Sequence, residues 1–300
     1  MKTRPPGQGT VTLRRGVIRL QAADAAFRHL ERLKHRQLYR HQCREFFVEG
    51  VKAINRARAH GWAFRALIFA AGRPLSSWAR ELLAATPHAD HIEVSPSLMS
   101  RLSDKDHPSE VVATIGMPPE SAERIRPPGE ALVVVFDRPS SPGNLGSVIR
   151  SCQALGADGL IVTGAGTDLY HPLTVRASMG ALFAMPTVRL DSHREVGRWV
   201  AGLAAPGRRP GSGTQRAQLV GTSAGAALPA EAVDLTVPTV LVFGNETSGL
   251  SAAYQGLCDL LVRIPMEGDA DSLNVASAAA ILLYEAGRQR RRAATSSGHR

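Results

Sequence analysis

The feature that most constrains the fold is a repeated alternation of short apolar runs and helical segments between residues 131 and 292. The apolar runs are rich in Val, Ile and Leu and end near Gly, Asp, Asn or Pro, which is typical of strands. They span residues 131–137, 159–164, 186–190, 218–223, 239–245 and 259–265. Helical spacing marks residues 144–155, 171–183 and 192–203, and a closing helix is expected from about Leu273. This alternation predicts an α/β domain with a mostly parallel sheet and helices on both faces.

A smaller block of strands and helices precedes this domain. Residues 24–45 predict one or two amphipathic helices, and four strands then alternate with three helices up to residue 117. Two Pro-rich stretches, at residues 118–119 and 127–129, predict a linker. We therefore expect a basic flexible tail over 1–22, a smaller N-terminal α/β domain over 23–117, a linker over 118–130, the larger domain over 131–292 and a flexible tail over 293–300.

The positive charge of the chain is concentrated near its N-terminus. Residues 1–60 contain 14 Lys or Arg and 4 Asp or Glu, which equals the net charge of +10 of all 300 residues. Such clustering is expected of a segment that meets a polyanion. The candidates for contact with RNA phosphates are Arg28, Arg32, Arg36, Arg40 and Arg44. The alternative is that these arginines form an ordinary solvated helix face.

Several functional classes are disfavoured by the sequence. Cys43, Cys152 and Cys258 are widely spaced and form no CxxC pair, which argues against a disulfide framework or a Cys-based zinc site and favours the reducing cytoplasm. The run G-T-S-A-G at 221–225 fits a hydrolase nucleophile elbow, but the later histidine that this mechanism needs is present only as His299. No P-loop, H-E-x-x-H motif or run long enough to span a membrane is present. We expect no metal.

Three polar turns follow predicted strands of the larger domain. They are F-D-R-P-S-S-P-G-N-L-G-S-V-I-R at 136–150, L-V-F-G-N-E-T-S-G-L at 241–250 and I-P-M-E-G-D-A-D-S-L-N at 264–274. The carboxyl ends of parallel strands meet at one edge of a sheet, so these turns should form one site. They offer many backbone donors and few titratable groups, which suits a cofactor bound largely by the main chain.

In this order the turns resemble the three motifs of the SPOUT methyltransferases, specifically the TrmH-like branch, which methylates ribose 2′-hydroxyls of RNA. The matching residues are Asn144, Gly146 and Arg150; Gly244, Asn245, Glu246 and Gly249; and Ile264, Pro265, Ser272, Leu273 and Asn274. The resemblance covers residues 132–288 and implies a deep trefoil knot and S-adenosyl-L-methionine as cofactor. The segment 44–50 and the order of elements resemble the RNA substrate-binding domain often fused ahead of such enzymes.

The resemblance also implies residue roles. Cofactor-binding residues would be Thr222, Gly244, Asn245, Ile264, Met266 and Leu273, and catalytic residues would be Arg150, Asn144, Glu246, Ser272 and Asn274. A guanidinium is not readily deprotonated, so Arg150 would hold a phosphate and stabilise the developing alkoxide rather than act as a simple base. Asn144 would orient this arginine. The identity of the proton acceptor stays open.

The expected activity is methyl transfer to a ribose 2′-hydroxyl of large-subunit ribosomal RNA. Longer stretches resemble the avilamycin-resistance ribosomal RNA methyltransferases of actinomycetes, but the nucleotide, and a role in antibiotic resistance or in housekeeping, stay open. The alternatives are a transfer-RNA 2′-O-methyltransferase and a catalytically silent RNA-binding protein. Related enzymes also imply a homodimer, built here from the small-residue face of Ala276, Ala279 and Ala280 and from Leu145, Val148 and Ile149 beside Arg150.

Overall fold

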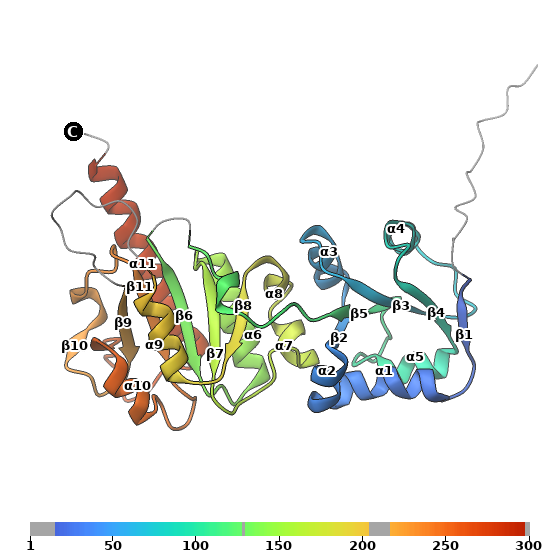
Figure 1. Ribbon diagram of the computed structural model, residues 1–300, viewed down its shortest axis with the longest axis horizontal. Helices are drawn as coiled ribbons and strands as arrows, with labels where there is room; N and C mark the ends of the chain where they lie inside the picture. Colours follow the sequence, from blue (N-terminus) through green and yellow to red (C-terminus); the bar gives the residue numbers. More distant parts are fainter. Residues whose placement is uncertain (1–15, 128–129, 204–216, 298–300) are drawn as a thin grey trace, which may run out of the picture. The chain divides into compact units, whose positions relative to one another are not determined.

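The protein is described here by a computed structural model, which describes residues 16–127, 130–203 and 217–297 (Figure 1). Most of the predicted basic tail and the Gly/Pro/Arg-rich loop at 206–216 lie outside these residues. The chain divides into two compact units, and their main boundary in the sequence lies between Met117 and Pro118. Each unit has its own sheet.

The N-terminal unit contains a mixed five-stranded sheet in the order β1-β4-β3-β5-β2. In chain order its elements are β1 (Ile18–Leu20), α1 (Ala25–His35), α2 (Gln37–Cys43), β2 (Glu45–Glu49), α3 (Val51–Ala59), β3 (Phe64–Ala70), α4 (Ser77–Ala85), β4 (Asp90–Val94), α5 (Pro96–Leu102) and β5 (Val111–Gly116). Figure 1 shows α1 and α5 on one face of this sheet and α3 and α4 on the other. Phe27 and Leu30 of α1 pack with Phe47, Ile68 and Met99 in the core.

The predicted N-terminal tail is shorter than expected. Residues 18–20 pair in parallel with β4, and Ile18 lies opposite Ile92 while Leu20 lies opposite Val94. Leu20 is buried at 4% exposure. The prediction of a tail to residue 22 was wrong for residues 18–20, because these three residues form a strand by pairing with β4, and a run this short gives no clear strand signal in the sequence.

The C-terminal unit contains a seven-stranded sheet in the order β10-β12-β9-β11-β6-β7-β8. All of its pairings are parallel, as the sequence predicted. In chain order its elements are β6 (Leu132–Asp137), α6 (Pro142–Ala154), β7 (Gly159–Thr163), α7 (Pro172–Ala177), α8 (Ala181–Ala184), β8 (Thr187–Leu190), α9 (His193–Ala201), β9 (Gln218–Thr222), β10 (Leu228–Pro229), β11 (Thr239–Phe243), α10 (Ala252–Leu257), β12 (Leu260–Arg263) and α11 (Val275–Ser297). Short 3-10 turns lie at Ala122–Arg124 and Ala230–Ala232.

Helices cover both faces of this sheet, which confirms the predicted fold class. Figure 1 shows α9 and α10 on one face and α6 and α11 on the other. Val133 and Val135 of β6 share a core cluster with Val196 of α9 and Tyr254 of α10. Since side chains alternate along a strand, the neighbouring residues of β6 face the opposite layer, where α6 packs against both α7 and α11.

Two predicted helices differ from the observed ones. The expected helix over 171–183 is interrupted, because Met179 (φ 51°) and Gly180 (φ 89°) are left-handed and separate α7 from α8. The closing helix begins at Val275 rather than near Leu273, and the Asn274 side chain accepts the backbone N–H of Ala276 at 2.8 Å as its cap. It also continues to Ser297, so the predicted tail from residue 293 was too long.

The three cysteines are free thiols in different environments. Cys43 is exposed, Cys152 is buried and Cys258 is partly buried. Burial raises the pKa of the Cys152 thiol well above its ordinary range and raises the pKa of Cys258 to about 12. Among the described residues, no helix has both the length and the apolar character to cross a bilayer, and no cluster of His, Cys, Asp or Glu could hold a metal ion.

Candidate active site

A cavity of about 450 Å³ lies at the carboxyl edge of the parallel sheet. It is lined by residues 222–224 after β9, residues 243–250 after β11, Ile264 and Met266 after β12, and residues 272–275 at the start of α11. The loops that follow parallel strands converge at this edge, as the sequence predicted. The volume is within the roughly 300–1,000 Å³ of small-molecule sites.

All six residues expected to bind the cofactor line this cavity. They are Thr222, Gly244, Asn245, Ile264, Met266 and Leu273. The Met266 and Leu273 side chains stay 37% and 39% exposed, so the cavity offers apolar surface. The Thr222 hydroxyl donates to the Val242 carbonyl at 3.2 Å, which ties the end of β9 to β11.

The loop after β11 is folded tightly back on itself. The backbone groups of Asn245 and Gly249 exchange two hydrogen bonds, of 3.0 and 2.9 Å. A Cβ atom on Gly244 would lie 2.1 Å from the carbonyl carbon of Gly249, closer than any side chain can approach a backbone atom. Glycine at 244 is therefore required for the loop to close beside the cavity.

Arg138 fastens this loop to the end of β6. Its guanidinium donates to the Asp137 carboxylate at 3.1 Å and to the Gly249 carbonyl at 3.0 Å. Its own carbonyl accepts from the Asn245 side chain at 2.8 Å. Arg138 has a φ of 52°, a conformation uncommon for a residue with a side chain. Sequence reasoning missed its role, since an arginine in a polar turn gives no distinct signal.

Glu246 connects the second turn to the first. Its carboxylate accepts from the Ser140 backbone N–H at 2.8 Å, the Ser140 hydroxyl at 2.6 Å, the Ser141 backbone N–H at 3.0 Å and the Asn144 amide at 3.2 Å. Partial burial opposes ionisation, but the hydrogen bonds from Ser140 and Ser141 outweigh it and lower the pKa of the Glu246 carboxyl. The group is therefore a carboxylate at neutral pH.

Asn144 extends this connection to the third turn. Its side-chain oxygen accepts from the Asn274 amide at 3.0 Å, so Glu246, Asn144 and Asn274 form one chain of hydrogen bonds. The three turns that the sequence analysis grouped together therefore meet through these side chains. Glu246, Asn274 and Ser272 also line the cavity.

Arg150 is separate from this group. It is exposed on α6, six residues beyond Asn144, which is roughly 9 Å along a helix. It does not line the cavity, and among the described residues it forms no hydrogen bond or ion pair. The predicted orientation of Arg150 by Asn144 is not seen within one chain, because both ends of the Asn144 amide are engaged elsewhere.

Four of the five arginines expected to contact RNA are exposed, namely Arg28, Arg32, Arg36 and Arg44. Arg40 is the exception, with 1% exposure. Its guanidinium donates to the carbonyls of Leu33 and Lys34 at 2.9 and 3.0 Å and so caps the end of α1. The RNA-contact prediction was wrong for Arg40, because the extended backbone at Arg36 breaks the helix and turns α2 away from the α1 face.

The residues expected at a dimer interface are mostly buried in their own unit. Leu145, Val148, Ile149 and Ala279 are fully buried within it. That part of the prediction was wrong, because these side chains fill the layer between α6, α11 and the sheet. The large apolar side chains exposed on the outside of this layer are Leu173, Met179, Ile281 and Tyr284.

Comparison with known proteins gives two family matches. The SpoU rRNA Methylase family matches residues 131–284, and the SpoU L30e-like domain matches residues 24–113. The chain is 45% identical over 273 residues to the 23S rRNA (uridine(2479)-2′-O)-methyltransferase of Streptomyces viridochromogenes, covering 91% of this chain and 92% of that protein. It is 31% identical to the 23S rRNA (guanosine(2553)-2′-O)-methyltransferase RlmP of Bacillus subtilis, covering 64% and 70% of the two chains.

Solved structures agree with these matches. The SpoU methyltransferase AviRb of Streptomyces viridochromogenes, crystallised with the cofactor AdoMet, superposes with a TM-score of 0.82 at 44% identity and covers 89% of this chain and 98% of that one. An AdoMet-bound rRNA methyltransferase of Sinorhizobium meliloti superposes with a TM-score of 0.79 at 30% identity, covering 91% and 98%.

Proposed function

The chain belongs to the SpoU rRNA methylase family, and we propose that it transfers a methyl group from S-adenosyl-L-methionine to a ribose 2′-hydroxyl of 23S ribosomal RNA. The resemblance drawn from the three turns is thereby confirmed at the level of the family. Two relatives are named as 23S rRNA 2′-O-methyltransferases, and two similar structures contain AdoMet.

The observation that carries the proposal is the cavity at the sheet edge. It brings together all six expected cofactor residues with Glu246, Ser272 and Asn274. The residues fit the cofactor, because the closed loop at residues 243–250 lines the cavity and Ile264, Met266 and Leu273 add apolar surface for an adenine ring. When bound there, S-adenosyl-L-methionine supplies an activated methyl group.

The protein side chains would align the nucleophile and balance its charge. Glu246 holds the first turn through Ser140 and Ser141, while Asn144 and Asn274 fix the third turn beside it. Arg150, which stays positively charged, would hold the phosphate next to the target ribose and stabilise the oxygen as its proton leaves. Fixed donors of this kind contribute to catalysis because they need no reorganisation during the reaction.

Arg150 would act on the site of a second subunit. It is exposed on α6, outside its own cavity, and the layer of α7, α6 and α11 exposes Leu173, Met179, Ile281 and Tyr284. A two-fold homodimer through this layer would bury these apolar side chains and enclose Arg150 at the interface. The family resemblance also implies that the C-terminal segment forms a trefoil knot, and the placement of β9 between β12 and β11 is compatible with it.

The N-terminal unit would bind the RNA through its exposed arginines. Arg28, Arg32, Arg36 and Arg44 are exposed to solvent. The two 23S relatives act, by name, on a uridine and on a guanosine, so the target nucleotide of this chain is a question for experiment. Because ribosomal RNA is made and modified there, the protein would work in the cytoplasm.

The test is methyl transfer with the full-length protein. Deproteinised 23S rRNA from a strain lacking the protein is incubated with S-adenosyl-L-methionine carrying a labelled methyl group. We expect one labelled nucleotide, located by primer extension at low nucleotide concentration, and no label with Leu273→Arg. Absence of methylation with 23S rRNA, together with methylation of transfer RNA, would contradict the proposed substrate. Growth of the expressing strain with ribosome-targeting antibiotics then separates resistance from housekeeping.

A further inference from the structure

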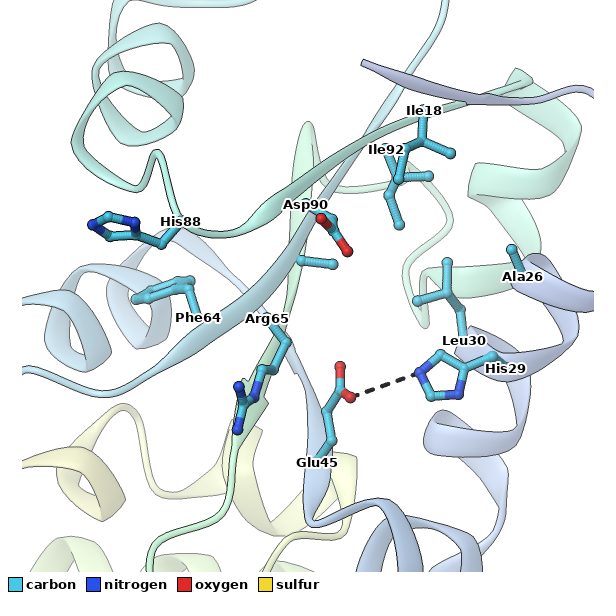
Figure 2. A pocket seen from close by; sticks show the side chains of 11 residues that line it. Ile18, Ala26, His29, Leu30, Glu45, Phe64, Arg65, His88, Asp90 and Ile92 are labelled. Carbon is cyan, nitrogen blue, oxygen red and sulfur yellow. Dashed lines mark ion pairs between the residues drawn. The ribbon is translucent and has the colours of Figure 1, made fainter. Parts of the chain in front are cut away.

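A second cavity, of about 570 Å³, lies within the N-terminal unit (Figure 2). It opens between α1 and the first residues of β2, β3 and β4. It is lined by Ile18, Ala26, His29, Leu30, Glu45, Phe64, Arg65, Ala66, His88, Asp90 and Ile92. None of these residues belongs to the cavity at the edge of the parallel sheet.

The lining combines apolar surface with a few polar groups. Leu30 and Ile92 belong to the hydrophobic core, so the cavity continues the apolar interior of the unit. Glu45 is the polar side chain most withdrawn from solvent, with 14% exposure, and its carboxylate lies 3.7 Å from Nε2 of His29. Figure 2 shows Glu45 between Arg65 and His29, and Phe64 close to His88. An apolar body with a few convergent polar groups is the usual composition of a ligand site.

Arg65 reaches this cavity because of a β-bulge. On the neighbouring strand Phe64 lies opposite Ile115 and Ala66 lies opposite Thr114, so Arg65 is the extra residue between them. A bulge redirects the side chain of its extra residue. The Nε atom of Arg65 would be 3.2 Å from a Cβ on Gly116, so glycine at 116 provides the space for this guanidinium. Among the described residues Arg65 forms no hydrogen bond or ion pair, and it is exposed.

Two exposed arginines adjoin the cavity lining in the chain. Arg28 is next to His29 and Arg44 is next to Glu45, and both are among the arginines predicted to contact RNA. Arg19 is also next to a lining residue, Ile18, but it pairs with Glu93 on the other face of the sheet. A lining that holds the Glu45 carboxylate, close to exposed arginines, suits a nucleotide whose phosphate stays outside while its base enters. Proteins commonly recognise single-stranded RNA by such splayed-out bases.

We propose that this cavity receives one unpaired guanine of the RNA substrate. The Watson–Crick edge of guanine has two adjacent N–H donors and one carbonyl acceptor. The Glu45 carboxylate would accept from both donors, and the Arg65 guanidinium would donate to the carbonyl. Uracil, cytosine and adenine lack two adjacent ring-edge donors of this kind. This inference depends on the proposed function only because it takes RNA to be the ligand of the cavity.

The test uses mononucleotides and the full-length protein. Guanosine monophosphate is titrated while the ring signals of His29 and His88 are followed by nuclear magnetic resonance. We expect saturable shifts with this nucleotide, shifts at least about tenfold weaker with the uridine, cytidine and adenosine nucleotides, and loss of the preference in Glu45→Gln. Equal shifts with all four nucleotides, or none with guanosine monophosphate, would overturn the proposal.

A kinetic measurement provides the second arm. Glu45→Gln should raise the KM for 23S rRNA about tenfold with little change in kcat, and Arg65→Gln should act in the same direction. Glu81→Gln, which changes an exposed carboxylate on α4 outside the cavity, is the matched control and should behave as the unmodified protein. An equal KM in Glu45→Gln and Glu81→Gln would also overturn the proposal. The mononucleotide titration needs neither cofactor nor activity, so failure of methylation alone would count only against the proposed function.

Discussion

Glu246 is the residue on which the geometry of the candidate active site depends most. Its carboxylate accepts four hydrogen bonds from the first turn, while its own residue belongs to the second. An ionised acceptor strengthens each of these bonds relative to a neutral one. The hydrogen bonds from Ser140 and Ser141 outweigh the effect of burial and lower the pKa of this group, so the ionised carboxylate is the form that joins the two turns.

We expect Glu246→Gln to destabilise the protein at neutral pH. The NH2 group of the glutamine side chain is a donor, and it would face N–H and O–H groups of Ser140, Ser141 and Asn144 that also donate. The loss should be on the order of 1 kcal/mol in urea unfolding at pH 7. Since the folded pKa lies below the ordinary value of 4.5, the carboxylate contributes its stability above that pH. The contribution disappears as the pH falls through the folded pKa. The difference between the two proteins should therefore shrink as the pH falls below 4.5, and a difference independent of pH would contradict this account.

Gly244 has a different role, which is steric. The Cβ of Gly244→Ala would meet the backbone of Gly249, which cannot move without opening the loop. We expect affinity for S-adenosyl-L-methionine, measured by calorimetry, to fall at least about tenfold, a cost of roughly 1.4 kcal/mol. Gly268→Ala is the matched control, because a Cβ there would have no atom within 4 Å. Equal affinities of the two variants would show that closure of the loop does not shape the cavity.

At the scale of elements, the contact between α6 and α7 depends on a single small residue. A Cβ on Gly146 would lie 2.5 Å from both the Ala177 side chain and the Thr174 carbonyl. The two helices therefore approach each other closely at Gly146. Helix α6 also packs against α11, and the first turn leads directly into its N-terminus. The position of Asn144 follows from this packing.

Gly146→Ala should lower the free energy of unfolding by about 1–3 kcal/mol, because overpacking outweighs the better helix propensity of alanine. Gly143→Ala on the same helix meets only the Ser141 hydroxyl, at 3.7 Å. That variant should be unchanged or up to about 1 kcal/mol more stable. Urea denaturation of both variants provides the comparison, and a Gly146→Ala protein as stable as Gly143→Ala would contradict the close contact.

Most elements could be predicted from the sequence because the pattern and the packing agree. The six strands expected after residue 130 all form, since each is an apolar run, and in five of them most residues are buried. The three turns could be assigned to one site from the sequence because parallel strands bring their carboxyl ends together. β10, with two residues, could not be predicted because it exists only through its pairing with β12.

Burial of charged residues was harder to predict. Arg40 and Arg36 have the same chemistry and lie four residues apart, yet Arg40 is buried and Arg36 is exposed. The difference comes from the extended backbone at Arg36, and no residue type in this segment predicts that the helix is interrupted there. The family resemblance implies that Arg150 reaches the cavity of a second subunit, and its separation from the cavity of its own chain is compatible with that expectation.

At the scale of the whole molecule, the position of Arg150 predicts shared active sites. Arg150→Ala and Leu273→Arg should each be inactive alone. The first variant lacks the cationic group, and the second places a positive charge in the cofactor cavity. When the two proteins exchange subunits, a mixed dimer places one intact arginine beside one intact cavity. We expect the mixed dimers to recover methyltransferase activity, with at most about one of the two sites in each mixed dimer active.

The control for this experiment is proof of subunit exchange, by mass spectrometry of differently tagged chains. Verified exchange without any recovered activity would mean that Arg150 serves its own chain. A fully active monomer, identified by light scattering under assay conditions, would remove the dimer from the mechanism.

The different environments of the three thiols make the folded protein selective toward electrophiles. A maleimide dye reacts with thiolates, so it should reach Cys43 while Cys152 and Cys258 resist, the one through burial and the other through a pKa raised to about 12. Mass spectrometry of the intact protein should then find a single label at pH 7. That label lies in the N-terminal unit, directly before Arg44. The native chain thus carries its own attachment point for a fluorophore, next to one of the arginines expected to contact RNA, without any engineered residue.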